Sequence, residues 1–405
     1  MKINISKYFI DVRAKRLSSV DVDPLKSNQH EIGIIQDQVK LYGNESRVFK
    51  GHFIYLNDDD EKKIDCSVDL TYYDSRVNQP DRSAEFRLYY QSNPVIELAN
   101  SKDLLVMARR SPDEMTLIVA PAGSNAESQL IYLFGLDEKD NKVMIKNLLE
   151  HDFELNYSSE IILEFIGIEI PKEDFNWLDQ IVAKFGYRFP TTREFSEFSR
   201  SISSSTDPFN DPDSALLKWM EFEEMLFRTM EKHLVQQKLK DGFGDGGIDV
   251  DDFIAFSLGV QNRRKSRAGF AFENHLEYLF NVHRLMYSRG KETERKSKPD
   301  FVFPGIEFYH DTNFNVNLLT MLGVKTTAKD RWRQVLAEAD KIKQKHLITL
   351  EPAISTNQTS EMSSLNIQLV VPKEIAKTYK TEQQKELMIL DDFIKMVSDR
   401  QRKLS

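Results

Sequence analysis

The sequence has few of the residues that mark secreted, membrane-spanning or fibrous proteins. Cys66 is the single cysteine among 405 residues, which excludes a disulfide framework or a cysteine-built zinc site and is typical of a reducing cytoplasm. The 16 glycines and 13 prolines are too few for a collagen-like chain or for disorder throughout. No apolar run reaches the roughly 18–20 residues that span a bilayer, and the start, MKINISKYFI, lacks the apolar stretch of a signal peptide. We therefore expect a cytoplasmic globular protein without a membrane partner.

The chain also lacks an excess of positive charge. With 55 Lys and Arg against 64 Asp and Glu, its formal net charge is -9, which by itself argues mildly against a nucleic-acid partner. Its length suits two domains of roughly 100–200 residues each. The charge of the whole chain does not describe local clusters, so the positions of the basic residues decide this question.

Short apolar and aromatic runs, separated by polar turns, fill the first 170 residues. Alternation such as Val68, Leu70 and Tyr72 predicts β-strands. We expect a mostly β domain over 1–170, folded as a small barrel, followed by a linker over 171–184. The runs are VFKGHFIYL, CSVDLTYY, EFRLYYQS, DLLVMAR, EMTLIVAPAG, QLIYLFGL and IILEFIGIEI.

Helical and strand patterns alternate in the rest of the chain, which is typical of an α/β domain with a sheet covered on both faces. We expect this domain over 185–405. Apolar residues at helical spacing predict helices over 213–239, 266–287, 329–344 and 382–400. The predicted strands are FVFPG, MLGVKTT, HLITL and IQLVVP.

Two of these strands carry an acid and a lysine at their ends. Asp300 stands at the start of FVF, and Lys325 stands at the end of MLGVK. Such a pair suits metal-assisted phosphodiester cleavage, in which the carboxylate holds a divalent ion and the lysine stabilises the developing negative charge. The usual nuclease pattern, PD…(D/E)-x-K, has a second acid two residues before the lysine, where this chain has Gly323.

A second acid must then come from elsewhere in the chain. Glu338 lies on the helix predicted after Lys325, and Glu273 lies on the helix before the strands. The spacing leaves a structural alternative open, because a PD pair is a common turn at a strand start and Glu338 suits a solvated helix surface. From these residues alone, a nuclease and an ordinary α/β domain both fit.

Positive charge is concentrated near this pair. The segment QNRRKSR, with Arg263, Arg264 and Arg267, is expected just before a helix, where side chains and free backbone N–H groups both favour phosphate. Lys329-Asp330-Arg331 is expected to open the next helix and could enter a major groove, where Arg pairs with guanine and an acid accepts from cytosine. A solvated helix face, or an ion cluster at a helix start, explains these charges equally well.

Longer segments resemble one family. NRRKSRAG, FENHLEYLF, KPDFVFPG, YHDTNF and VKTTAKDRWRQVLAEADKI are similar to the catalytic domain of the EcoRII-like type II restriction endonucleases, over roughly 185–400. AKRLSSVD, HEIGI and YYDSR resemble their N-terminal domain more weakly. A match of this length is far more specific than a short PD…K pattern.

The resemblance implies a multidomain fold, with an N-terminal, mostly β, B3-like pseudobarrel and a C-terminal α/β PD-(D/E)xK restriction-endonuclease-like domain. It implies a type IIE enzyme of a restriction-modification system, a homodimer through the C-terminal domain, that cuts double-stranded DNA at short CC…GG sites with Mg²⁺. In the family, the N-terminal domain binds an effector copy of the site, and this binding relieves autoinhibition.

The resemblance also implies roles for individual residues of the C-terminal domain. Asp300 matches the metal-binding acid, Lys325 the catalytic lysine, and Glu338 a displaced acid that replaces the one missing at Gly323. The implied metal ligands are Asp300, Glu338 and Glu273. Tyr309 matches a tyrosine beside the active site, and Lys329, Asp330 and Arg331 match a triplet that reads the outer C·G pairs.

The implied effector-binding residues are His30, Arg76, Arg82, Glu85 and Arg87. The loop NQPDRSAEFR departs from the family pattern, because Phe86 replaces a lysine and Gln79-Pro80 makes the loop less basic. This departure leaves the effector sequence and effector dependence open, and surface charges decorating a turn are the plain alternative.

Two other functions compete with a restriction enzyme. One is a cleavage-inactive, sequence-specific DNA-binding regulator, and the other is a repair nuclease without sequence preference. The intact set of Asp300, Lys325 and Glu338 favours an enzyme over the regulator. The recognition sequence, the cleavage position and the partner methyltransferase do not follow from the sequence.

Overall fold

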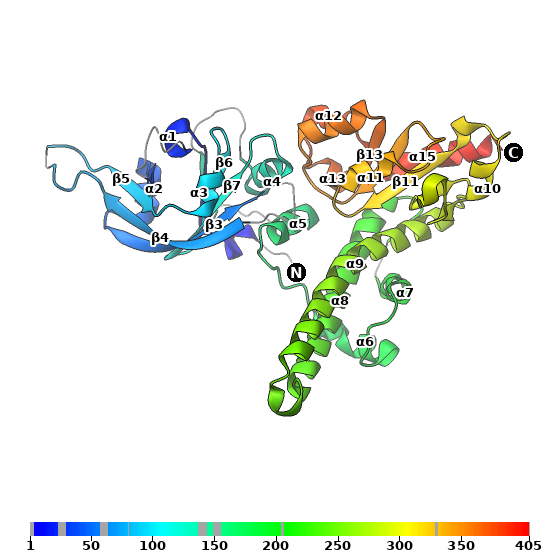
Figure 1. Ribbon diagram of the computed structural model, residues 1–405, viewed down its shortest axis with the longest axis horizontal. Helices are drawn as coiled ribbons and strands as arrows, with labels where there is room; N and C mark the ends of the chain where they lie inside the picture. Colours follow the sequence, from blue (N-terminus) through cyan, green and yellow to red (C-terminus); the bar gives the residue numbers. More distant parts are fainter. Residues whose placement is uncertain are drawn as a thin grey trace. The chain divides into compact units, whose positions relative to one another are not determined.

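The computed structural model describes residues 4–22, 30–56, 64–79, 81–136, 144–148, 155–203, 206–328 and 331–404 (Figure 1). The chain divides into two compact units. The first contains Met1–Ile168 and Pro352–Gln358, and the second contains Glu169–Glu351 and Thr359–Ser405. Each unit has its own sheet.

The first unit is built on an eight-stranded sheet of order β2-β5-β4-β3-β7-β6-β1-β8. β3 and β7 are parallel, whereas the other neighbouring strands are antiparallel. The strands are β1 (Asp11–Arg16), β2 (Glu31–Gly33), β3 (Arg47–Tyr55), β4 (Ile64–Asp74), β5 (Phe86–Tyr90), β6 (Leu104–Ser111), β7 (Glu114–Ala120) and β8 (Met144–Asn147). The helical elements are η1 (Ile5–Lys7), α1 (Ser19–Val22), α2 (Gln36–Tyr42), α3 (Pro94–Leu98), α4 (Asn125–Phe134) and α5 (Tyr157–Phe165).

The alternating residues of the strands build the core of this unit. Leu70 and Tyr72 on β4 pack with Phe49 and Phe53 on β3 in one buried cluster, as alternation of apolar and polar residues requires. Gly51 on β3 lies opposite Val68 on the neighbouring strand β4, and a Cβ there would come within 2.6 Å of the Val68 carbonyl oxygen. A side chain at this position would therefore force the two strands apart.

Two segments that we expected as strands are helices. QLIYLFGL lies largely in α4, and the first half of IILEFIGIEI lies in α5. A short apolar run does not distinguish a strand from a buried helix. The distinguishing signal is the residue before each helix, because the side chains of Ser124 and Asn156 accept hydrogen bonds from the N–H groups of Glu127 and Ser159.

The second unit contains a six-stranded mixed sheet of order β14-β13-β12-β11-β10-β9. β11 through β14 are parallel neighbours, whereas β9, β10 and β11 pair antiparallel. The four predicted strands of this half are present as β10 to β13. The strands are β9 (Ser288–Arg289), β10 (Phe301–Phe303), β11 (Thr320–Lys325), β12 (Lys345–Thr349), β13 (Ile367–Val371) and β14 (Met388–Ile389).

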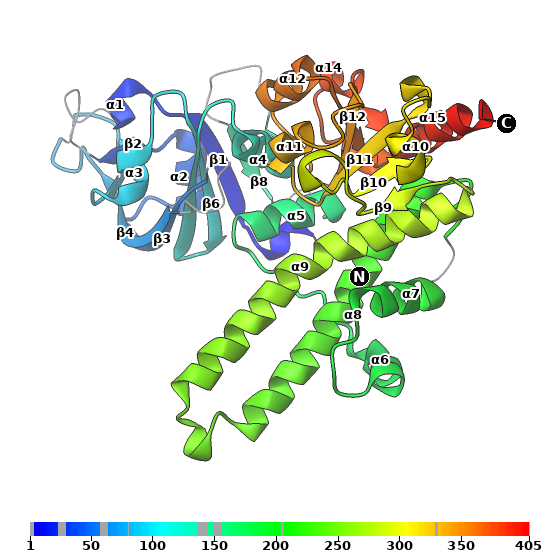
Figure 2. The same ribbon diagram turned by 45° about the vertical axis from the view of Figure 1, so that its right-hand side comes forward.

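Two long helices run side by side in this unit, as Figures 1 and 2 show. They are α8 (Pro212–Asp241) and α9 (Val250–Val282). α8 ends at Gly242, whose φ of 78° suits a glycine, and the Asp249 side chain caps the start of α9. The other elements are η3 (Phe175–Trp177), α6 (Leu178–Phe185), α7 (Thr192–Ile202), η4 (Asp245–Gly247), η5 (Glu294–Lys296), α10 (Ile306–His310), η6 (Val316–Leu318), α11 (Trp332–Leu336), α12 (Thr356–Ser364), α13 (Lys373–Ala376), α14 (Thr381–Gln384) and α15 (Leu390–Arg402).

The segment 171–184, expected as a linker, contains η3 and most of α6. Ile181 is completely buried, in a cluster with Phe195 and Phe227. The segment is therefore folded onto the second unit, because its apolar residues at helical spacing pack against α7 and α8.

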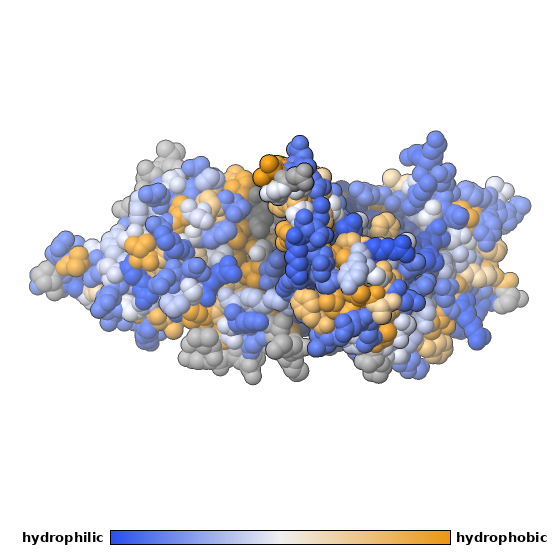
Figure 3. Space-filling model, turned by 90° about the horizontal axis from the view of Figure 1, so that it is seen from below, coloured by the Kyte–Doolittle hydropathy of each residue, from blue (hydrophilic) through white to orange (hydrophobic). Residues whose placement is uncertain are grey.

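Within the described residues, no helix is long and apolar enough to cross a membrane. On the face drawn in Figure 3, hydrophobic residues gather in patches that hydrophilic residues separate.

Candidate active site

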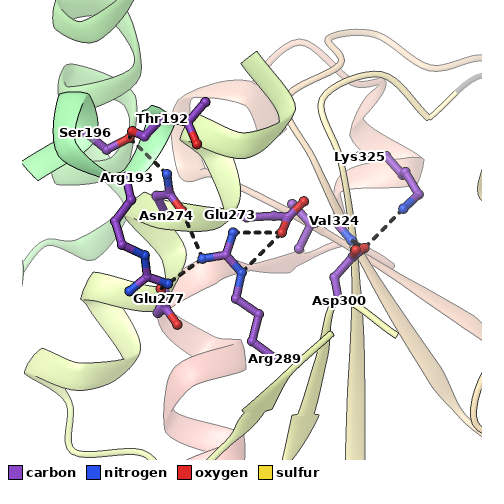
Figure 4. A network of polar contacts seen from close by, with 10 residues as sticks. All are labelled: Thr192, Arg193, Ser196, Glu273, Asn274, Glu277, Arg289, Asp300, Val324 and Lys325. Carbon is purple, nitrogen blue, oxygen red and sulfur yellow. Dashed lines mark hydrogen bonds and ion pairs between the residues drawn. The ribbon is translucent and has the colours of Figure 1, made fainter. Parts of the chain in front are cut away.

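The site lies where two antiparallel strands of the second unit meet. Asp300 directly precedes β10 and Lys325 ends β11, and the strand register pairs Phe301 with Leu322. Asp300 Oδ2 accepts hydrogen bonds from the Val324 N–H at 2.6 Å and from Lys325 Nζ at 3.1 Å (Figure 4). Each of the two charged side chains is 19% exposed. The structure thus places the predicted acid and lysine in contact at a partly open edge of the sheet.

Gly323 explains why the acid usually found two residues before the lysine is missing. A Cβ at Gly323 would come within 2.8 Å of Val335 Cγ2, on α11, which packs against this strand. An acidic side chain therefore does not fit between β11 and α11. A carboxylate at this site has to come from another part of the chain.

Glu338 is in a different local structure from the one we expected. The predicted helix over 329–344 is too long, because α11 ends at Leu336 and Glu338 lies in the bend that follows. Ala339 has a φ of 50°, which turns the chain. Lys345, on β12, donates hydrogen bonds to the carbonyl oxygens of Glu338 and, at 3.2 Å, of Ala339. A buried lysine thus holds the turn that carries Glu338.

The Glu338 carboxyl lies in the electrostatic field of the Asp300–Lys325 pair. Burial, followed by the negative charge of Asp300, raises the pKa of Glu338 to about 7, although Lys325 and Lys345 oppose this shift. Glu338 Oε2 is buried and has no hydrogen-bond partner among the described residues. A buried carboxylate oxygen without a donor is unfavourable unless a cation or another donor reaches it.

Glu273, on α9, lies between Asp300 and an arginine in Figure 4. Arg289 donates to Glu273 Oε2 from Nε at 3.2 Å and from Nη2 at 2.9 Å. Its Nη1 also donates to Asn274 and Glu277. Burial and the charge of Asp300 raise the pKa of Glu273, and the bonds to Arg289 oppose this shift.

Tyr309 is completely buried on α10. Its hydroxyl donates to the Glu294 carboxylate, at 2.7 Å and 2.5 Å from the two oxygens, and accepts from the Lys341 N–H at 3.2 Å. Burial and the bond to Glu294 raise the pKa of Tyr309. The tyrosine therefore contacts the segment just after Glu338, and nothing in its sequence pattern indicates Glu294 as its partner.

The basic segment QNRRKSR is not at the start of a helix, contrary to our expectation. It lies within α9, because Asp249 caps this helix well before the segment. Arg267 is only 5% exposed, with its guanidinium 4.4 Å from the Phe195 ring centre, so it stabilises the helix packing. Arg264 Nε donates to Glu231 at 2.6 Å, and Arg263 lies over the ring of Phe189.

The triplet predicted to read the DNA sequence is only partly within the described structure. Lys329 and Asp330 lie outside the described residues. Arg331 is exposed and directly precedes α11. The structure thus places one member of the triplet on the surface, between Lys325 and Glu338 in the chain.

The residues expected to bind effector DNA lie in the first unit, around the β4–β5 connection. Arg87, on β5, donates to Glu31 at 2.5 Å and to Glu85 at 3.0 Å. Glu85 also pairs with Arg76. The structure therefore brings Arg76, Glu85 and Arg87 together in one ion-pair network, anchored by Glu31 on β2.

Two further residues of this set lie apart from the network. Arg82 is exposed in the loop and donates to Gln79 at 3.3 Å. His30 directly precedes β2, has a φ of 48°, and its ring centre lies 5.8 Å from that of Tyr90.

The fold and the site define a class of protein: a mixed α/β sheet with a lysine and acids converging where strands end, as in restriction-endonuclease-like nucleases. Within the described part of the chain, no group of three His, Cys, Asp or Glu side chains is arranged to hold a metal ion. Carboxylates are the ligands that Mg²⁺ prefers, and Glu338, whose Oε2 has no hydrogen-bond partner among the described residues and which senses the charge of Asp300, is compatible with such an ion.

Comparisons with known proteins place the chain in one family. The family model described as EcoRII C terminal matches residues 227–394. The chain is 32% identical over 413 residues to the type II restriction enzyme EcoRII of Escherichia coli, with 97% of this chain and 95% of that enzyme covered. The chain therefore belongs to the EcoRII family, and it is a type II site-specific DNA endonuclease.

Solved structures of restriction endonucleases are more distantly similar. A metal-depleted Ecl18kI in complex with uncleaved DNA is 18% identical, with a TM-score of 0.45, and covers 57% of this chain and 86% of that chain. A PspGI–substrate DNA complex is 16% identical, with a TM-score of 0.42, and covers 53% of this chain and 94% of that chain.

Proposed function

We propose that this endonuclease is a homodimer, joined through its C-terminal domain, that hydrolyses both strands of duplex DNA at a short CC…GG site with Mg²⁺. The observation that carries the proposal is the group formed by Asp300, Lys325 and the buried carboxyl of Glu338. The pair of Asp300 and Lys325 is held by neighbouring strands, and Glu338 has an oxygen that lacks a donor among the described residues.

In this proposal, Asp300 and Glu338 hold the Mg²⁺, and Glu273 adds a third carboxylate nearby. The ion supplies Lewis-acid polarisation of the phosphate and of the attacking water. Lys325 Nζ, anchored 3.1 Å from Asp300, stabilises the negative charge that builds up on the phosphate. Tyr309 orders the segment after Glu338 through its bond with the Lys341 N–H.

Sequence reading is assigned to Lys329, Asp330 and Arg331, which contact the outer C·G pairs of the site. Arg331 supports this role by its exposure just before α11. An Arg that pairs with guanine discriminates against the wrong base by about 1–3 kcal/mol. Arg263 and Arg264 remain candidates for phosphate contacts, whereas the burial of Arg267 argues for a packing role.

We further propose that the first unit is a B3-like pseudobarrel that binds an effector copy of the site and relieves autoinhibition. Its predominantly antiparallel sheet and the loop between β4 and β5 support this proposal. The ion pairs of Glu85 with Arg76 and Arg87 orient these arginines. Arg82 and His30 complete the proposed DNA-contacting set.

Digestion of sequenced DNA that carries one or several sites, with and without Mg²⁺, tests these proposals together. We expect discrete bands only with the ion, ends that map to CC…GG sites, and faster cleavage when several sites are present. A short duplex containing the site, added in trans, should stimulate cleavage of the one-site DNA. Cleavage without site preference would contradict the proposed specificity, and equal rates on both DNAs would contradict effector control.

A further inference from the structure

A short segment connects the catalytic lysine to the proposed reading triplet. Lys325 ends β11, Thr326 to Ala328 follow, and Arg331 directly precedes α11. Glu338 comes just after α11. Residues 326–328 are therefore the described link between the catalytic lysine and the proposed reading triplet.

The end of the neighbouring strand β12 holds this segment. β11 and β12 are parallel, with Lys325 opposite Thr349. Thr349 Oγ1 donates to the Thr326 carbonyl oxygen at 3.2 Å. Two residues further on, Glu351 Oε2 accepts the Ala328 N–H at 2.6 Å. The segment is thus bound at two points from one strand end.

The hydrogen bond between the Ala328 N–H and the Glu351 carboxylate is buried and charge-assisted. Glu351 is 1% exposed and Ala328 is fully buried, and a hydrogen bond from a backbone N–H to a carboxylate is stronger in such surroundings than one between neutral groups. The Ala328 carbonyl oxygen in turn accepts the Trp332 N–H at 3.1 Å, at the start of α11. The contact therefore fixes both the segment and the first turn of the next helix.

Glu351 is itself held in place. Its N–H donates to Thr349 Oγ1 at 3.1 Å, and its carbonyl oxygen accepts from the Tyr379 hydroxyl at 2.8 Å. Its carboxylate thus extends from a rigid strand end, as a group that positions another element must.

We propose that Glu351 is a positioning residue for sequence discrimination: through the Ala328 N–H it fixes the described segment after β11 and the start of α11, where Arg331 lies. The proposal rests on the proposed reading role of the Lys329–Arg331 triplet. Because Glu351 is buried, it acts through the backbone of the segment. A small displacement at Ala328 therefore changes base reading more than it changes the chemistry at Lys325, which the contact with Asp300 holds separately.

The test compares wild type, Glu351→Ala and Glu351→Gln on the mapped cognate duplex and on duplexes with one base pair replaced. In Glu351→Ala, the ratio of kcat/KM between cognate duplex and duplexes changed at the outer pairs should fall by about five- to 150-fold, the range of one lost base contact. The ratio at inner pairs should stay as in wild type. Glu351→Gln should restore most of the discrimination, because its amide oxygen can accept the same N–H.

Two further variants separate this role from a loss of fold. Tyr379→Phe removes a bond that holds the Glu351 carbonyl oxygen in place, so it should lower the melting temperature and reduce the discrimination at the same outer pairs by a smaller factor than Glu351→Ala. Thr349→Val removes the other contact to the segment. It replaces Glu351→Ala in the test if that variant does not fold, and its discrimination should fall at the same outer pairs by a smaller factor than that expected for Glu351→Ala. A uniform loss on all duplexes in Glu351→Ala, or in Thr349→Val when it is the folded variant, would overturn the proposal. A wild-type enzyme that cuts without preference would instead overturn the reading role itself.

Discussion

Lys325 Nζ lies 3.1 Å from Asp300 Oδ2, and the same oxygen accepts the Val324 N–H at 2.6 Å. The acid is therefore bound both to the lysine and to the backbone of the strand that carries the lysine. This arrangement holds the two side chains in one geometry before DNA arrives, which in the proposed mechanism reduces the reorganisation needed during the reaction.

The first prediction concerns Lys325. Lys325→Ala should abolish cleavage, because no other group replaces the charge at the phosphate, while specific DNA binding persists. Lys343→Ala, an exposed lysine in the same basic run, is the matched control and should cut normally. Cleavage assays and gel-shift titrations measure the two properties. Normal cleavage by Lys325→Ala would remove this residue from the mechanism.

The second prediction concerns the carboxyl of Glu338. Glu338→Gln should lower the cleavage rate by more than about 100-fold. Loss of a residue that only hydrogen-bonds a metal ligand costs about 10- to 100-fold, and Glu338 is proposed as a ligand itself. It should also tighten metal-free DNA binding, since a negative charge near the phosphate is lost. Asp399→Asn, an exposed acid paired with Arg402, is the control. An unchanged rate at all Mg²⁺ concentrations would exclude Glu338 as a ligand.

The third prediction tests the arginine that binds Glu273. Arg289→Met frees this carboxylate from two hydrogen bonds, so cleavage should fall by about 10- to 100-fold and more Mg²⁺ should be required for half-maximal rate. Arg289→Lys should recover part of the rate. Arg193→Met removes a partner of Glu277 that does not contact Glu273, and its rate should be normal. If Arg289→Met and Arg193→Met lower the cleavage rate equally, the role of Arg289 is only to stabilise α9.

The fourth prediction concerns Arg331. Arg331→Ala should weaken binding at the cognate site by about 1–3 kcal/mol and leave non-specific binding nearly unchanged. Arg333→Ala, which removes an exposed arginine of α11 that pairs with Glu361 on α12, should affect both equally. Binding isotherms at fixed salt give the free energies. Equal losses on both DNAs for Arg331→Ala would mean that Arg331 contacts phosphate.

The fifth prediction is a pH dependence of stability that originates at His346 on β12. Burial, and then the positive charge of Arg400, lower the pKa of His346 to about 4. At pH values between the ordinary histidine pKa and this lowered value, His346 binds a proton in the unfolded chain but not in the folded protein. The free energy of unfolding therefore falls as the pH falls through this range. The expected loss from this residue between pH 7 and pH 5 is about 2 kcal/mol.

Tryptophan fluorescence during urea unfolding measures this effect, because the three tryptophans lie in the second unit. His346→Leu should reduce the difference in unfolding free energy between pH 7 and pH 5, since leucine binds no proton. His52→Leu, which changes a half-exposed histidine of the first unit, should leave the difference unchanged. The same pH dependence in wild type and His346→Leu would place its origin elsewhere.

Local patterns predicted the strands that frame the candidate site. The strands that carry Asp300 and Lys325 were predicted, because buried strands have continuous apolar runs and their ends have polar residues. The same reasoning was wrong for α4 and α5, whose apolar runs are equally compatible with a helix. The N-capping residues Ser124 and Asn156, which precede these two runs, indicate a helix rather than a strand.

Longer-range features were not predictable in this way. The helical pattern after Lys329 suggested a long helix, yet the chain turns at Ala339, where Lys345 binds the carbonyl groups of the turn. Arg267 was expected to face DNA, but the aromatic rings of neighbouring helices enclose it. Both outcomes depend on contacts between segments far apart in the chain.

The order of residues thus determines the two-part organisation, the strands of the second sheet, and the acid and lysine at adjoining strand ends. These follow from hydrophobic periodicity and from residue types, which are local properties. The tertiary structure alone decides that Val335 leaves no room for an acid at Gly323, that Glu338 is buried beside Asp300, and that Glu351 binds the Ala328 N–H. Packing distances, burial and charge between distant segments produce these features, and no local pattern contains them.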